Sequence, residues 1–125
     1  MSIESAHLAQ ARHNAELAKL LAVDMVYKDW VITATFYAAV HYVEAALGKR
    51  FGWHGENVSD ISPHIARLKK LKEKYSLGCQ NAYRSLYEAS KDVRYLRVPP
   101  SYYTDDAARE FLNNDLATIR KELGY

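Results

Sequence analysis

Cysteine is almost absent from this sequence, with Cys79 alone among 125 residues. A single cysteine excludes an intramolecular disulfide and leaves a cysteine-based zinc site without its other thiolates. Such cysteine usage is typical of a reducing compartment. Residues 1–21 carry several charged side chains, so they also lack the unbroken apolar core of a secretory signal. We therefore expect a cytoplasmic protein.

Glycine and proline are also scarce, with five and three residues. So few chain breakers exclude long irregular loops over most of the sequence, and the balance of 49% hydrophobic and 26% charged residues excludes a disordered chain. No stretch alternates apolar and polar residues for long enough to indicate a strand, and no internal repeat is present. At this length we predict one all-α domain that spans residues 1–125.

The longest apolar stretch, residues 30–47, is close to the length that crosses a bilayer. It contains Thr33, Thr35, His41 and Glu44, and a charged Glu in hydrocarbon costs roughly 3 kcal/mol on insertion scales. A helix that is apolar nearly all round is also typical of the centre of a bundle. We therefore expect a central helix here and no association with a membrane.

Apolar residues recur with helical spacing in five segments. The predicted helices cover residues 5–23, 30–47, 63–75, 79–96 and a last segment that begins at residue 104. We expect Asp29 to cap the second helix and Gly48 to end it. Gly78 should close the third helix, and Leu96 should be the last core residue of the fourth. This order predicts an antiparallel bundle of four to five helices.

Two of these segments carry a recognisable pattern. Residues 29–47 contain the run Tyr-Ala-Ala-Val-His and end in an Ala-Leu pair, while residues 83–95 end in Arg-Tyr before a polar loop. With His64 opening the helix between them, they resemble the second and fourth helices of the HEPN (higher eukaryotes and prokaryotes nucleotide-binding) domain family. The resemblance covers almost the whole chain. It implies a homodimer in which the paired fourth-helix regions form a cleft.

Active HEPN domains cut RNA with an Arg that is followed, after four to six intervening residues, by a His. At that spacing on one helix the Arg holds phosphate oxygens and the His transfers a proton. No Arg in this sequence is followed by a His at that spacing. The nearest pair, Arg50 and His54, has one residue too few between them and lies in a predicted loop. The missing motif argues against this ribonuclease activity and not against the fold.

Basic and tyrosine side chains are interleaved along the fourth predicted helix and just beyond it. This mixture suits phosphate contacts and base stacking. Lys91 could instead pair with Glu88 or Asp92, and Tyr83 belongs to the predicted core. The candidate ligand-binding residues are Arg84, Lys91, Arg94, Tyr95 and Arg97.

The middle of the sequence is basic and its ends are acidic. Residues 49–97 contain eleven Lys or Arg against five Asp or Glu, whereas the rest of the chain contains six against ten. This asymmetry favours a polyanion or an acidic partner, although a net charge of +2 is low for a dedicated nucleic-acid binder. For the basic run of the third helix, residues 67–74, we therefore expect a solvated face in preference to a binding surface.

The five histidines do not form a recognisable metal motif, because none has zinc-finger spacing. His41 and Glu44 stand three residues apart, but their order is the reverse of that in carboxylate-bridged helical sites, and no second such pair exists. We therefore predict no metal and no cofactor, with His41 hydrogen-bonded in the interior.

Three functions remain open. The first is a binding module for RNA, a nucleotide or a partner protein, and it is the one we expect. The second is a ribonuclease toxin or defence protein with a substituted, metal-independent active site, in which the fold brings His64 or His41 to Arg94; a nucleotidyltransferase-like antitoxin would be its partner. The third is a structural subunit. We also expect a homodimer, because the second helix is apolar enough to need cover from another subunit or from the fifth helix.

Overall fold

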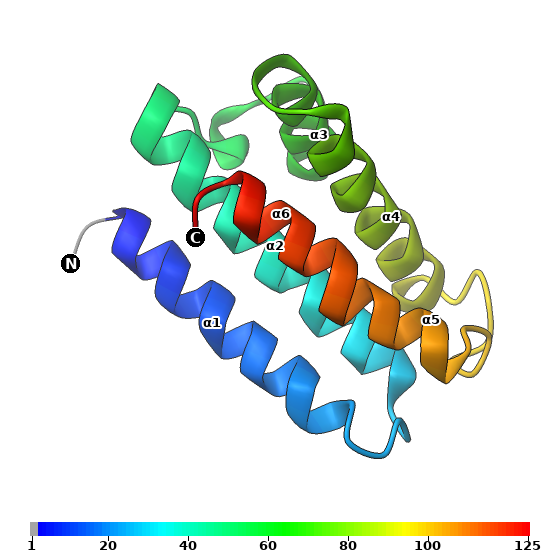
Figure 1. Cartoon of the computed structure of the whole chain (residues 1–125). Helices are drawn as coiled ribbons and strands as arrows, with labels where there is room; N and C mark the ends of the chain where they lie inside the picture. The colour runs from blue at the N-terminus through cyan, green and yellow to red at the C-terminus, as the bar shows by residue number, and fades with distance from the viewer. Residues whose placement is uncertain (1–2) are drawn as a thin grey trace.

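The computed structural model describes residues 3–125 and confirms an all-α bundle; the described residues contain no strand. Three consecutive elements, α5, the π-helical segment η2 and α6, follow one another without a gap and form one continuous rod (Figure 1). The elements are α1 (Ile3–Leu21), α2 (Lys28–Phe51), the short 3-10 helix η1 (Gly55–Asn57), α3 (Pro63–Lys74), α4 (Leu77–Arg94), α5 (Asp105–Glu110), η2 (Phe111–Asp115) and α6 (Leu116–Glu122).

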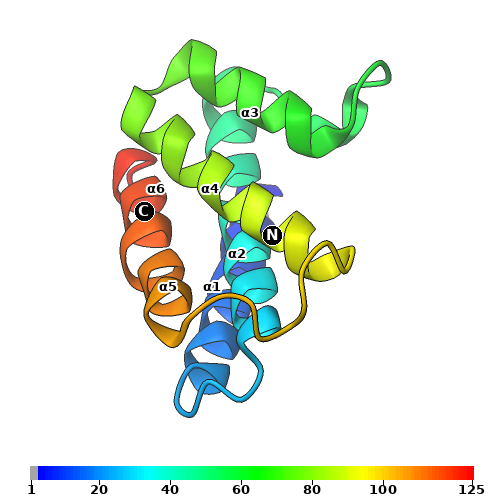
Figure 2. The same ribbon diagram turned by 90° about the vertical axis from the view of Figure 1, so that its right-hand side faces the viewer.

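Helix α2 is the centre of the bundle. Helix α1 runs antiparallel along one side of it, and α4 and the α5–α6 rod cover other sides (Figure 1). Figure 2 shows α3 lying across one end, beside the start of α4. Because α2 is covered by three other helices, its residues meet neighbours on almost every side.

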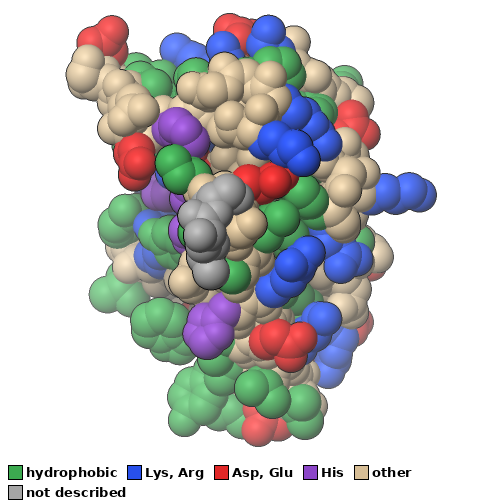
Figure 3. Space-filling view, turned by 90° about the vertical axis from the view of Figure 1, so that its left-hand side faces the viewer, with side chains coloured by type: hydrophobic (Ala, Val, Ile, Leu, Met, Phe, Trp, Pro, Cys, Tyr) green, Lys and Arg blue, Asp and Glu red, His purple; other side chains and the backbone are tan. Residues whose placement is uncertain are grey.

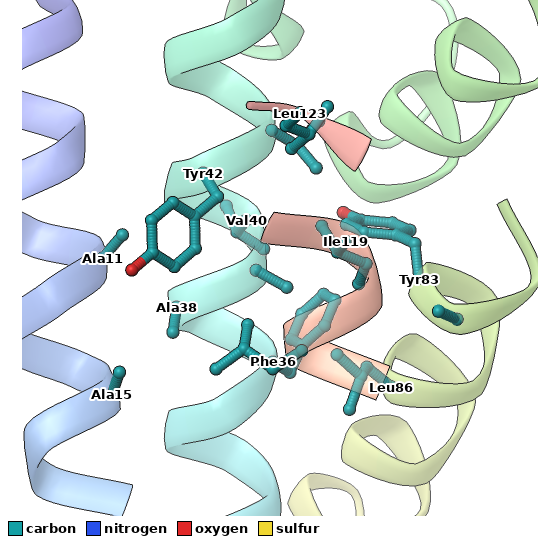
Figure 4. Close-up of a cluster of buried hydrophobic side chains, with 14 of the residues drawn as sticks. Ala11, Ala15, Phe36, Ala38, Val40, Tyr42, Tyr83, Leu86, Ile119 and Leu123 are labelled. Atoms are coloured by element: carbon teal, nitrogen blue, oxygen red, sulfur yellow. The ribbon is translucent and has the colours of Figure 1, made fainter. Parts of the chain in front are cut away.

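The contact between α1 and α2 depends on small side chains. Ala11, Ala15 and Ala18 of α1 are buried at steps of four and three, as their spacing predicted. Figure 4 shows Ala11 and Ala15 pointing toward Tyr42 and Ala38 of α2. Small side chains let the two backbones approach closely, which fills this side of the core.

The other side of α2 packs against larger side chains. Phe36 of α2 lies near Leu86 of α4 and Ile119 of α6 in the core (Figure 4). All three side chains are fully buried, and burial of each one stabilises the fold by roughly 1.5–3 kcal/mol. This layer therefore fixes the position of α4 relative to α2.

Among the described residues, α2 is the one helix long and apolar enough to cross a membrane, and 78% of its most apolar window is buried inside the bundle. Its one acidic residue within that stretch, Glu44, is only 4% exposed and is paired with Arg67 of α3. The side chains that cover α2 therefore come from the same chain, which supports the interpretation as a core helix.

Both ends of α2 differ from the prediction. The helix begins at Lys28 instead of after Asp29. The Asp29 carboxylate lies in the first turn, where it interacts favourably with the positive end of the helix dipole. It also continues through Gly48 to Phe51. The end comes at Gly52, where a left-handed backbone with φ of 61° lets the amide donate to the Gly48 carbonyl.

The predictions that Gly78 closes the third helix and that Leu96 is a core residue were also wrong. Helix α3 ends at Lys74, and Gly78 lies inside the first turn of α4 because the Ser76 hydroxyl caps that helix by accepting from the Cys79 amide. Leu96 is not a core residue. It lies beyond the end of α4 with φ of 54° and is 77% exposed, because the chain turns away from the helix there.

Candidate functional site

Aromatic and basic side chains from three helices meet where α2, α3 and α4 come together. Phe36 lies at the centre, with ring centroids 5.1 Å from His64 and 5.8 Å from Tyr87. The helix start positions His64, because Ser62 caps α3 and Pro63 occupies its first turn. We refer to Phe36, Tyr37, His64, Tyr87 and Arg94 as the Arg94 cluster.

Arg94 is a half-buried cation without an anionic partner. Its guanidinium donates to the Tyr37 hydroxyl and the Ser90 hydroxyl, each at 3.1 Å. Its Cζ lies 5.5 Å from the ring centres of Phe36 and Tyr37 and 5.0 Å from that of Tyr95. Within the described residues, Arg94 forms no ion pair with a carboxylate, and its buried Nε has no hydrogen-bond partner. A cation in these surroundings favours a bound anion.

His64 is held in one protonation state. Arg67 Nη1 lies 3.0 Å from Nδ1 of His64, and a guanidinium can only donate, so Nδ1 is the acceptor and Nε2 carries the proton. Burial lowers the pKa of His64 to about 4, with the charges of Arg67 and Arg94 acting in the same direction. The ring is therefore neutral near pH 7 and offers a donor at Nε2.

The clearest error of the sequence analysis concerns Arg67. It was counted among the solvated basic residues of the third helix, but it is only 8% exposed. Its Nε donates to Oε1 of Glu44 at 2.6 Å, and the Gly55 amide donates to the same oxygen at 3.0 Å. A buried carboxylate requires such partners. An acidic residue inside the most apolar helix was the signal in the sequence that a buried cation would face it.

The predicted ligand-binding residues divide into two groups. Lys91 lies beside the cluster, with Nζ 4.5 Å from the Tyr87 ring centre and 3.5 Å from Glu88, one of its two expected partners. Tyr95 packs its exposed ring against Arg94. Arg84 is exposed about 15 Å away along α4, and Arg97 is exposed beyond the end of that helix. The structure thus brings together Lys91, Arg94 and Tyr95 and leaves the other two outside.

His41 lies outside the Arg94 cluster. It is half-buried, and its Nδ1 is 2.9 Å from Nδ1 of His7 on α1. Burial lowers the pKa of His41, and His7 and Arg67 act in the same direction. Histidine side chains reach the surface on the side of the molecule that carries α1 (Figure 3). Of the two alternative catalytic histidines, it is therefore His64 that lies with Arg94.

The whole chain was compared with models of known protein families, with curated proteins and with solved structures. None of them matches this chain. The resemblance to HEPN domains therefore stays a prediction, and the chemistry of the Arg94 cluster is the best guide to function. That cluster combines an uncompensated guanidinium, a neutral imidazole donor and several aromatic rings, a set that can hold an anion attached to a planar group.

The protonation state of His64 predicts a pH-dependent stability. The ring faces Arg67, Arg94, Tyr37 and Tyr87, and its low pKa in the folded protein means that protons bind to the unfolded chain first. The contribution of the neutral ring to the free energy of unfolding is fully present above about pH 6.5 and is lost as the pH falls toward 4. The loss between pH 7.5 and pH 5 should be about 1 kcal/mol, since solvent screens the charges around a half-exposed ring.

Urea unfolding of wild type and His64→Gln at the two pH values measures this effect. Gln keeps an acceptor for Arg67 but does not titrate, so the variant should lose about 1 kcal/mol less than wild type on acidification. Equal losses in the two proteins would show that His64 is not held neutral.

Proposed function

We propose that this protein is a helical-bundle module that binds a phosphate group of RNA or of a nucleotide at the Arg94 cluster. The observation that carries the proposal is the half-buried guanidinium of Arg94, which has aromatic neighbours and no carboxylate partner within the described residues. A guanidinium matches phosphate oxygens with two parallel hydrogen bonds and is weakly hydrated, so it loses little by leaving water for a phosphate.

Neighbouring groups support a nucleotide rather than a simple anion. Tyr95 is largely exposed beside Arg94 and offers a ring on which a base can stack, a contact worth about 1–3 kcal/mol. Lys91 adds a second cation, and Nε2 of His64 adds a donor. Residues 49–97 carry the excess of basic side chains noted above, which supports attraction of a polyanion.

Binding to labelled single-stranded RNA and to a labelled nucleotide, followed by fluorescence anisotropy, tests the proposal. Affinity should fall steadily as salt rises, because phosphate contacts release counterions from the nucleic acid. Absence of saturable binding to either probe at low salt would contradict the proposal. Binding of an acidic peptide in their place would favour the structural subunit that docks an acidic partner.

A ribonuclease is the second candidate, and the nearness of His64 to Arg94 is the observation in its favour. The state of that histidine argues against it. A ring with a pKa of about 4, whose Nδ1 accepts from Arg67, is a weak base and is not in the imidazolium form that a general acid needs near pH 7. The HEPN motif that supplies a His on the same helix is also missing.

We therefore expect the purified protein to cut generic RNA poorly or not at all in metal-free buffer. General acid–base catalysis contributes a factor of about 10² to 10⁴, and without it any remaining cleavage should be hard to see. Gel analysis of RNA after prolonged incubation measures this. Robust cleavage by wild type that is abolished in His64→Ala or His41→Ala at unchanged stability would establish a substituted active site, and with it the toxin and its antitoxin partner.

The proposed module is a homodimer, but the surface that supports this proposal is not α2, on which the sequence-based prediction relied. Helix α2 is covered by its own chain, but apolar side chains are exposed together around the connection between α1 and α2. They are Leu20, Val23, Val26, Tyr27 and Trp30. An exposed apolar group of this kind is typical of an interaction surface, and two-fold pairing is the most common arrangement of small homo-oligomers.

Light scattering at micromolar concentration should return about twice the chain mass of 14.3 kDa. Trp30→Glu should reduce the mass to that of one chain, because the new charge would have to be buried in the interface. Leu77, which is exposed elsewhere, provides the control Leu77→Glu. A mass near 14.3 kDa for wild type would contradict the dimer.

A further inference from the structure

Three side chains able to bind a metal ion meet outside the Arg94 cluster. They are His7 of α1, Glu44 of α2 and His54, which follows α2, and one ligand atom of each lies within 4.8 Å of those of the other two. The fold alone brings them together, because they stand far apart in sequence or on separate elements. We infer that His7, Glu44 and His54 form a site for one divalent transition-metal ion, for which Zn²⁺ is the probe.

The distances suit a shared ion better than direct hydrogen bonds. Nδ1 of His54 lies 3.7 Å from Oε2 of Glu44, which is too long for a hydrogen bond. An ion about 2.0–2.2 Å from each atom separates two ligands by roughly 3.3 Å at the tetrahedral angle and by at most about 4.2 Å. This pair already has such a separation. The most distant pair must close by no more than about 1.5 Å to reach the tetrahedral value.

Other groups hold the three ligands in place, as is usual around bound metals. Nδ1 of His7 is engaged by His41 at 2.9 Å, which leaves Nε2 of His7 for the ion. Oε1 of Glu44 accepts from Arg67 and, at 3.0 Å, from the Gly55 amide. Oε2 receives only a longer 3.4 Å hydrogen bond from the same amide, and it is the oxygen that faces His54. A Cβ on Gly48 would lie 2.7 Å from Cε1 of His54, so glycine at that position makes room for the ring.

The ligand set selects the class of ion. Two imidazoles with a single carboxylate suit Zn²⁺ and related ions, whereas Mg²⁺ and Ca²⁺ prefer oxygen ligands throughout. Three protein ligands leave a fourth position for water. Solvent reaches this region through an open cleft lined by Ile3, Glu4, Gly48, Lys49 and His54.

The test uses the full chain without a histidine tag, freed of metal by EDTA and dialysed. Isothermal titration with ZnCl₂ should show one Zn²⁺ per chain, and a thermal melt should move to higher temperature when Zn²⁺ is added. His7→Gln and His54→Gln should each weaken Zn²⁺ binding at least tenfold. Even the loss of a group that only hydrogen-bonds to a metal ligand lowers metal affinity by about 10- to 100-fold. His13→Gln, an exposed histidine of the same α1, should bind like wild type.

Two results would overturn the site: absence of stoichiometric Zn²⁺ binding by folded wild type, or binding that survives in both His7→Gln and His54→Gln. Because these ligands lie on different elements, either variant remains informative if the other fails to fold by circular dichroism. The test of this site is separate from that of the proposed function, since RNA binding is measured in EDTA, without bound metal.

Discussion

Replacing Arg94 with Ala should weaken RNA or nucleotide binding by about 10- to 100-fold. A hydrogen bond to a charged group contributes roughly 1.5–3 kcal/mol, and each 1.4 kcal/mol is a tenfold change in affinity. Arg94→Lys should recover only part of the loss, because an ammonium keeps the charge but not the planar fork that matches phosphate. Fluorescence anisotropy with one RNA probe at one salt concentration measures the series.

Arg84→Ala is the matched control for this experiment. Arg84 lies on the same helix and carries the same charge, but it is exposed and distant from the cluster. Its loss should change affinity by less than about twofold, as screening between exposed charges would predict. Equal losses in the two Ala variants would mean that the basic surface binds RNA by charge alone, and the assignment of the site to Arg94 would be wrong.

Arg67→Met should reduce the free energy of unfolding by about 3–5 kcal/mol. Met fills a similar volume, but it leaves the carboxylate of Glu44 buried without its cation. That is a large part of the 5–15 kcal/mol that stabilises a typical domain, so the variant should be close to unfolding at 37 °C. Urea unfolding in EDTA measures the change without any contribution from metal.

A double variant separates the charge from the packing. In Glu44→Gln/Arg67→Met neither side chain is charged, and the Gln oxygen can still accept from the Gly55 amide. Most of the lost stability should return, because an isolated buried charge costs far more than a neutral amide. A single variant that stays within 1 kcal/mol of wild type would show that the ion pair is not buried in solution.

Arg67 also joins the two candidate sites. It donates through Nε to Glu44 and through Nη1 to His64, so the carboxylate proposed to bind a metal and the imidazole of the Arg94 cluster share one guanidinium. Loss of Arg67 should therefore affect both sites, whereas the variants at His54 and Arg94 each act on one. Variants at His54 and Arg94 therefore separate the two sites, which a variant at Arg67 cannot do.

Local patterns in the sequence were sufficient to predict the helices. The recurrence of apolar residues depends only on neighbours within one or two turns, and the structure confirms it in α1, where Ala11, Ala15 and Ala18 are buried. Errors arose where two local signals compete. Gly48 is a typical helix end, yet the helix continues to Gly52 because the left-handed turn forms there instead.

The sites could not be predicted in the same way, because they depend on how the helices face one another. Periodicity gives the apolar stripe of α3, but Arg67 points inward only because Glu44 lies opposite it on α2. Similarly, His64 and Arg94 are thirty residues apart, and only the crossing of α3 over the bundle brings them to the same cluster (Figure 2). The sequence offered their nearness as a hypothesis and could not choose between His64 and His41.

The most direct measurement of the central claim is the NMR signal of the Arg94 side-chain Nε–Hε group during titration with RNA. This group is buried and has no hydrogen-bond partner within the described residues, and Arg94→Lys identifies its resonance by removing it. Binding of phosphate should shift that resonance with the same saturation as the anisotropy, while the Arg84 resonance stays unchanged. An unmoved Arg94 resonance in protein that is saturated with RNA would contradict the account.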